Sequence, residues 1–139
     1  PQGGAPKDLN LYQTQKALDN AGHAVKDGGT VILVGSCFEG FGNQVFEEWM
    51  LKYTNPDDMI QALHAHFQLG AHKATAIAML KKRADILFVS DMDSAIVEKT
   101  FLKPVHDLQS AVDACLKKYG NDADVIVMPY GGSTLPVCQ

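Results

Sequence analysis

The 139-residue sequence lacks a long apolar run, because no stretch approaches the roughly 20 residues that a membrane-spanning helix needs. It also lacks a recognisable secretory signal, an internal repeat and a low-complexity tract. The net charge of −4 provides no excess of positive charge for nucleic acid or anionic lipid. We therefore expect one domain with no membrane or nucleic-acid partner.

Cysteines and nucleotide-binding motifs are scarce too. Cys37, Cys115 and Cys138 are odd in number and form no CxxC motif, which favours a reducing compartment such as the cytoplasm. Neither GxGxxG nor GxxxxGK[ST] occurs, so the glycines of GFG and YGG are expected to form tight turns. The first residue is Pro1 rather than Met, and we expect the chain to be part of a longer protein.

What the sequence does contain is an alternation of helical patterns with short apolar runs. Three continuous runs are typical of parallel strands covered on both faces: 30–35, 85–90 and 124–130. Helical patterns lie between them, at about 10–25, 43–53, 56–67, 71–83, 93–101 and 107–120. This order predicts an α/β fold, a three-layer sandwich with a mainly parallel sheet flanked by helices.

The loops that follow the three predicted strands are rich in Gly, Ser and Asp, at 36–42, 90–94 and 129–136. Ligands of such folds gather at the carboxyl ends of the strands. The N-terminal QGGAPKD resembles these loops, so we expect it to follow a further strand that is not in this sequence.

The first helical pattern separates an apolar stripe from a polar pair. At 100° per residue, Gln13 and Lys16 are neighbours on a side away from the buried stripe, which comprises Leu11, Thr14, Leu18, Ala21 and Val25. Asn10 is a plausible N-cap for this helix. A solvated helix face explains such a pair as well, but an ammonium and an amide in a first turn also suit an anion.

Several motifs together indicate a family. The stretch GGAPKDLNLYQTQKALDNA, followed in order by TVILVGSCFEGFGN, FEEW, LGAHKA, a strand ending in SD and MPYGGSTLP, resembles the C-terminal domain of the nickel-dependent lactate racemase family of 2-hydroxyacid racemases and epimerases. The first stretch is the most specific of these motifs. The similarity covers essentially the whole chain.

The resemblance implies that residues 1–139 are the C-terminal lobe of a two-domain isomerase and are inactive alone. The N-terminal catalytic domain of such proteins holds a nickel pincer cofactor, a pyridinium mononucleotide attached to a lysine, and supplies the acid/base histidines. The implied chemistry is transient hydride transfer from C2 of a small 2-hydroxy acid to the cofactor. No catalytic or metal-binding residue is then expected in this chain, and the fragment alone is expected to bind no cofactor.

By match to the YQxxK stretch, Gln13 and Lys16 are implied to face the substrate and to hold its carboxylate. One departure concerns LGAHKATA, where some family members place a Trp against the substrate. This sequence has His72 and Lys73 there, and its one Trp is Trp49. We therefore expect His72 and Lys73 to contribute to substrate binding, and a second cation favours a larger or more acidic substrate.

Other chemistry-bearing residues have simpler explanations. His64 and His66 point about 160° apart on a helix and do not chelate one metal together. Cys37 is expected to be a small buried residue, and Asp91 and Asp93 to cap the helix that follows. A weaker hypothesis makes Cys37 or these acids the centre of a self-sufficient enzyme. The main alternative is a non-catalytic α/β module that binds a small anion or a partner protein.

Overall fold

The structure, a computed structural model, describes residues 1–120 and 122–137. Three strands form one sheet in the order β1 (Thr30–Val34), β2 (Asp85–Val89) and β3 (Lys103–Pro104). Both pairings are parallel, and Thr30 lies opposite Asp85. The predicted parallel sheet and the first two predicted strands are confirmed, whereas the short strand β3 was not predicted.

Each predicted helical pattern corresponds to a helix. Their bounds are α1 (Leu11–Gly22), α2 (Gln44–Lys52), α3 (Pro56–Ala65), α4 (Ala71–Lys81), α5 (Ser94–Val97) and α6 (Leu108–Tyr119), and a 3₁₀ turn, η1 (Gly131–Ser133), follows near the C-terminus. Asn or Asp side chains accept a backbone N–H at the start of every helix except α4, which begins after Gly70. These local caps explain why the helix starts are readable from sequence.

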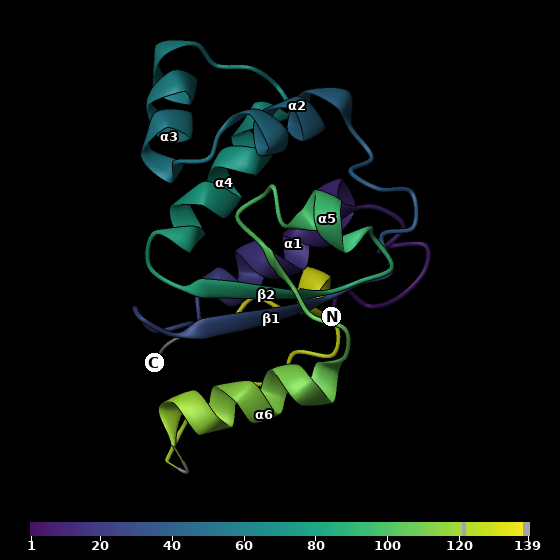
Figure 1. The fold of residues 1–139 in the computed structure, drawn as a ribbon, viewed down its shortest axis with the longest axis vertical. Coiled ribbons are helices and arrows are strands. Elements are labelled where there is room, and N and C mark those ends of the chain that lie inside the picture. Colours follow the sequence, from purple (N-terminus) through teal and green to yellow (C-terminus); the bar gives the residue numbers. More distant parts are fainter. Residues whose placement is uncertain (121, 138–139) are drawn as a thin grey trace.

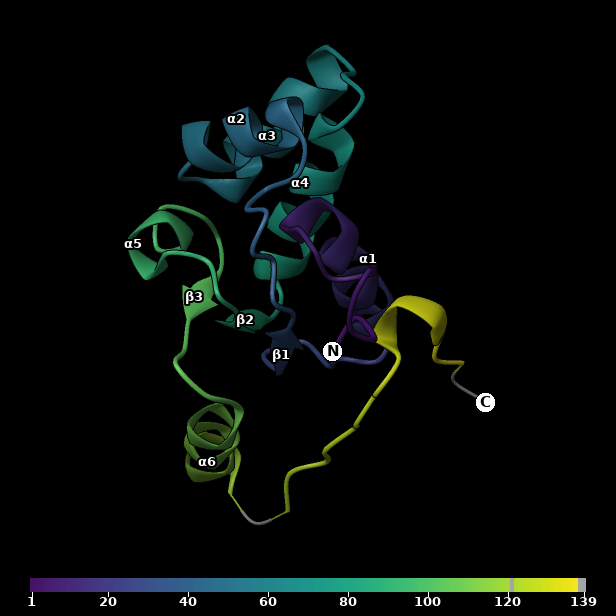
Figure 2. The ribbon, with the colours of Figure 1, turned by 90° about the vertical axis from the view of Figure 1, so that its right-hand side faces the viewer.

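The elements form three layers. Helices α1 and α4 cover one face of the sheet and α6 lies across the other, as Figures 1 and 2 show. The core lies between the sheet and the first of these layers, where Leu18, Leu33, Ile77 and Phe88 are buried. The three-layer α/β sandwich is thus confirmed. Across the described ranges, no helix combines the length and the apolar character needed to cross a membrane.

The third predicted strand is wrong for this structure. Residues 124–130, here called the tail segment, form no strand, and Val125, Ile126 and Val127 expose 63%, 65% and 75% of their surface. A strand needs a neighbour to share its backbone hydrogen bonds. Within residues 1–120 and 122–137, no strand pairs with the tail segment. Cys138, the third cysteine, lies outside the described residues.

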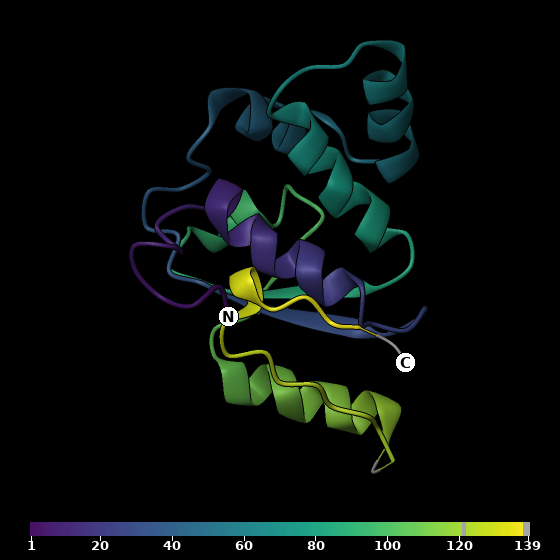
Figure 3. The same ribbon diagram turned by 180° about the vertical axis from the view of Figure 1, so that it is seen from behind.

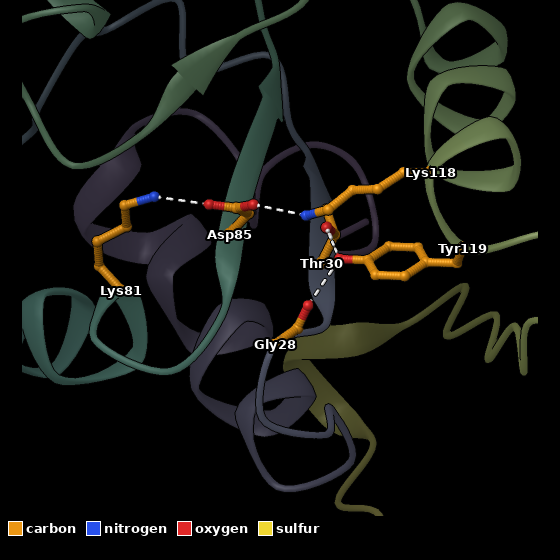
Figure 4. A network of polar contacts seen from close by, with 6 residues as sticks. All are labelled: Gly28, Thr30, Lys81, Asp85, Lys118 and Tyr119. Atoms are coloured by element: carbon orange, nitrogen blue, oxygen red, sulfur yellow. Dashed lines mark hydrogen bonds and ion pairs between the residues drawn. The ribbon is translucent and has the colours of Figure 1, made fainter.

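A polar network ties α6 to the sheet at the start of β2. The Asp85 carboxylate accepts hydrogen bonds from Lys81 Nζ at 2.8 Å and Lys118 Nζ at 2.9 Å, and Tyr119 Oη donates to the Gly28 carbonyl at 2.8 Å (Figure 4). The Lys118 ammonium, followed by that of Lys81, lowers the pKa of Asp85 to about 2. The ionised form of Asp85 is therefore favoured in the folded state.

We expect this network to give a measurable acid dependence of stability. Because the pKa of Asp85 is lower in the folded than in the unfolded chain, its contribution is present above about pH 4 and is lost as the pH falls toward 2. The pair is half exposed, so the contribution should be below about 1 kcal/mol. Urea unfolding between pH 2 and pH 5 should show a shallower pH dependence for Asp85→Asn. An unchanged slope would show that the ion pairs add nothing.

Candidate functional site

The start of α1 is attached to the loop that follows β1. Backbone N–H groups of Leu11 and Tyr12 donate to the carbonyls of Gly40 and Phe41 at 2.9 and 3.1 Å, and Cys37 N–H donates to the Asp8 carbonyl at 2.8 Å. The first turn of α1 therefore lies at the carboxyl end of β1. This is the edge of the sheet where the sequence predicted a binding site.

Asn10 fixes the first turn of α1 through both ends of its amide. Its Oδ1 accepts the Gln13 N–H at 3.1 Å, and its Nδ2 donates to Glu39 Oε2 at 3.0 Å. Gly42 lies directly against the Asn10 side chain, and a Cβ atom on Gly42 would overlap it. The second glycine of GFG, Gly42, is thus needed for the close approach of the loop to the helix cap.

Gln13 and Lys16 are adjacent, as predicted. Lys16 Nζ donates to Gln13 Oε1 at 2.7 Å, and Lys16 is exposed while Gln13 is half-buried. On the opposite side of α1, Leu11, Thr14 and Leu18 are buried. The pair therefore lies outside the core of the domain, where a carboxylate from another molecule has access to it.

Lys73, from α4, joins this pair. Its Nζ donates to the Tyr12 carbonyl at 2.8 Å and lies 4.0 Å from the centre of the Tyr12 ring, a cation–π contact. Burial and then the charge of Lys16 lower the pKa of Lys73, while Asp19 opposes them. Lys73 is thus bonded to Tyr12, the residue directly before Gln13, while Lys16 is bonded to Gln13 itself. An anion bound at this turn of α1 would offset the repulsion between the two ammonium groups.

His72 points to a different neighbourhood. Its Nδ1 accepts the Gly70 N–H at 3.2 Å, and its ring stacks on Phe67 with centroids 6.0 Å apart. Trp49, from α2, reaches the same loop, since its Nε1 donates to Gln68 Oε1 at 3.2 Å. The structure thus brings Lys73 to Gln13 and Lys16, and sets His72 and Trp49 at the α3–α4 loop.

The remaining candidate residues have structural roles. Cys37 is fully buried and 3.2 Å from Thr14 Oγ1, and burial raises the pKa of its thiol to about 11, so it is a poor nucleophile. Asp93 caps α5, as predicted, by accepting the Ala95 N–H. Asp91 instead accepts a hydrogen bond from the Ser36 hydroxyl, which links the loops after β2 and β1.

Tyr12 is a neighbour of the candidate residues, and sequence reasoning missed it. It was assigned no role, although its ring and its carbonyl both contact Lys73 and its ring also packs on Phe46. Its position directly before Gln13 in YQTQK was the available signal. Its contact with Lys73 spans 61 positions and is not readable from local patterns.

Comparison with known proteins decides the family. The sequence model of the protein family "lactate racemase C-terminal domain" matches residues 1–135 of this chain. The chain belongs to this family. The polar pair, the loop after β1 and the LGAHKA stretch all lie within the matched residues.

Two similar relatives are full-length lactate racemases. One, from Thermoanaerobacterium thermosaccharolyticum, is 27% identical over 138 residues, covering 96% of this chain and 32% of the relative. The other, from Lactiplantibacillus plantarum, is 28% identical over 134 residues, covering 93% and 32%. The chain therefore spans about a third of the length of these relatives.

A solved structure supports the same fold. The lactate racemase apoprotein from Thermoanaerobacterium thermosaccharolyticum superposes with a TM-score of 0.89 at 26% identity, covering 99% of this chain and 34% of the solved one.

The candidate site includes no cluster of metal ligands. Among the described residues of this chain, no three His, Cys, Asp or Glu side chains lie close enough to bind a metal ion.

We expect the close approach at Gly42 to be essential for the cap of α1. Gly42 and Gly40 both have positive φ, at 75° and 71°, but only Gly42 meets a neighbour. Gly40→Ala should therefore cost about 1 kcal/mol of backbone strain. Gly42→Ala adds the overlap with Asn10 and should cost about 2 kcal/mol more. Urea denaturation of the two variants measures this difference, and equal costs would refute the role given to Asn10.

Proposed function

We propose that this chain is the C-terminal lobe of a two-domain 2-hydroxyacid racemase or epimerase, and that Gln13, Lys16 and Lys73 bind the carboxylate of the substrate. The observation that carries this proposal is that two ammonium groups bond to neighbouring residues of the first turn of α1, Lys16 to the Gln13 amide and Lys73 to the Tyr12 carbonyl. The reaction type is supported by the two similar relatives, which are lactate racemases and of which the chain covers about a third.

The geometry suits a carboxylate better than a neutral ligand. Lys16 already donates to the Gln13 side-chain oxygen, and the free Nε2 of that amide remains a donor. A carboxylate accepting from Lys16 and Gln13 would form charge-assisted hydrogen bonds. Anchored in this way, the substrate presents C2 in one orientation to groups on the facing lobe. The chain's own residues bind and orient the substrate and carry no proton in the chemical step.

The nickel pincer cofactor is assigned to the rest of the protein. The described part of this chain brings no three metal-ligating side chains together, so these residues do not form a nickel site. A cytoplasmic location, expected from the cysteine pattern, belongs to the same proposal.

The alternative, a non-catalytic anion-binding module, rests on the same cation pair. The two functions differ in what the full-length protein does. An isomerase interconverts the enantiomers or epimers of a 2-hydroxy acid, whereas a binding module only retains the acid.

The main test is racemisation of a panel of 2-hydroxy acids by the full-length, cofactor-loaded protein. Lys16→Ala should lower kcat/KM by about 10- to 100-fold, because a charge-assisted hydrogen bond to the substrate is lost. Lys99→Ala, at an exposed lysine of the segment after α5, is the matched control and should leave activity unchanged. Racemisation that is insensitive to Lys16→Ala would refute the assigned site, and no racemisation of any acid would favour the binding module.

We expect the two residues of LGAHKA to differ in importance. Lys73 contacts Tyr12, the residue directly before Gln13, while the observed contacts of His72 are with Gly70 and Phe67. Titration of the full-length protein with a lactate analogue should therefore show about 10-fold weaker binding for Lys73→Ala. The loss for His72→Ala should be smaller, and larger for a bulky or dicarboxylic analogue than for a lactate analogue. Unchanged affinity in both variants would exclude this stretch from the site.

A further inference from the structure

One edge of β1 is open in this structure. Gly35 N–H donates to the Val89 carbonyl and Asp85 N–H donates to the Gly29 carbonyl, so the odd-numbered residues of β1 turn their backbone groups toward β2. The even-numbered residues Thr30, Ile32 and Val34 therefore turn theirs to the opposite edge. Among the described residues, only the Val34 carbonyl has a backbone partner there, the N–H of Gln2 at 3.3 Å. Half-buried backbone groups in a sheet normally require partners.

The tail segment passes on the side of this open edge, away from β2 (Figure 2). Its start is held by an ion pair between Asp124 and Lys26, 2.6 Å apart, close to the start of β1. At its far end, Gly131 N–H donates to the Pro1 carbonyl at 2.8 Å, beside the end of β1. Figure 2 shows the N-terminus between β1 and η1, and Figures 2 and 3 show the tail segment leading from the end of α6 to η1.

Pro1 and Gln2 bridge the two flanks. Gln2 N–H donates to the Val34 carbonyl, while the carbonyls of Pro1 and Gln2 accept from Gly131 and Gly132 N–H, at 2.8 and 3.4 Å. These two residues thus bond to β1 on one side and to the turn after the tail segment on the other. Gln2 is 4% exposed, and its Oε1 is buried without a hydrogen-bond partner in the described ranges.

Apolar side chains of the tail segment and of α6 are also exposed around this edge. The continuous run Val125, Ile126 and Val127 is mostly exposed, although such runs suit strands covered on both faces. Helix α6 carries an apolar stripe at helical spacing of which Ala111 alone is buried, the other members being Leu108, Val112, Cys115, Leu116 and Tyr119. A helix stripe of this kind normally packs on a sheet.

We infer that a fourth strand, formed by the residues that precede Pro1 in the whole protein, inserts between β1 and the tail segment and turns the tail segment into a fifth strand. The sheet would then read tail segment, inserted strand, β1, β2 and β3, all parallel. The strand β1 has five residues, so about five inserted residues suffice. The residue immediately before Pro1 would donate to the Ile32 carbonyl and accept the Val34 N–H.

The occupant follows from the contacts and from the family. Any residue joined to Pro1 starts between Val34 and Gly131, because Pro1 and Gln2 already bond to both flanks. The chain matches a C-terminal domain and spans about a third of its relatives, which supplies polypeptide on that side. The inference concerns how the domain is completed, and it stands independently of the proposed racemase function.

Hydrogen exchange of the full-length protein tests the inserted strand without reference to activity. Alternate amides of residues 125–128, those that face the inserted strand, should exchange about 100-fold or more slowly than in an unstructured peptide. The N–H groups of Ile32 and Val34 should be as slow as those of Val31 and Leu33. Exchange of all four amides at the unstructured rate would overturn the inference. Protection that disappears when the protein is diluted to a monomer would also overturn it, because a second copy would then supply the strand.

A matched pair of variants gives a second readout. Val127 and Val137 are similarly exposed in this structure, at 75% and 81%. If the tail segment becomes a strand and Val127 is buried on a face of the sheet, Val127→Asp should lower the melting temperature of the full-length protein by about 5 °C or more. Val137→Asp should leave it within about 1 °C. Equal, small effects of the two substitutions would contradict the inferred burial. If Val127→Asp yields no folded protein while Val137→Asp does, the inference is supported.

Discussion

The arrangement of the candidate site depends on one constraint, the backbone hydrogen bonds between the start of α1 and the loop after β1. Leu11 and Tyr12 donate to that loop, and Cys37 donates back to Asp8. Because these groups are fixed parts of the main chain, the first turn of α1 has one position relative to the carboxyl end of β1. This fixes where the side chains of Gln13 and Lys16 begin. Lys73 is attached to the same turn by its hydrogen bond to the Tyr12 carbonyl.

Most of the fold could be predicted because its signals are local. The continuous apolar runs of β1 and β2 and the Asn and Asp caps of the helices are written in a few neighbouring residues each. The tail segment carries an equally clear strand pattern but has no strand beside it among the described residues. Its conformation depends on a partner that no local pattern provides, and the prediction failed for that reason.

The site was predicted in part for a similar reason. Gln13 and Lys16 are three positions apart on one helix, so their contact follows from helical geometry. The contact between Tyr12 and Lys73 joins two helices, and the stacking of His72 on Phe67 depends on how the α3–α4 loop folds. Sequence placed His72 and Lys73 together because they are adjacent, but adjacent residues on a helix point about 100° apart, and the structure separates them accordingly.

The hydrogen bond from Trp49 to Gln68 has a practical consequence. Trp49 is the single tryptophan of these 139 residues, and its indole touches the loop that also carries Phe67, the stacking partner of His72. Indole emission depends on the polarity and hydrogen bonding around the ring. Intrinsic tryptophan fluorescence from these residues therefore originates at one known position, next to the segment that carries His72 and Lys73.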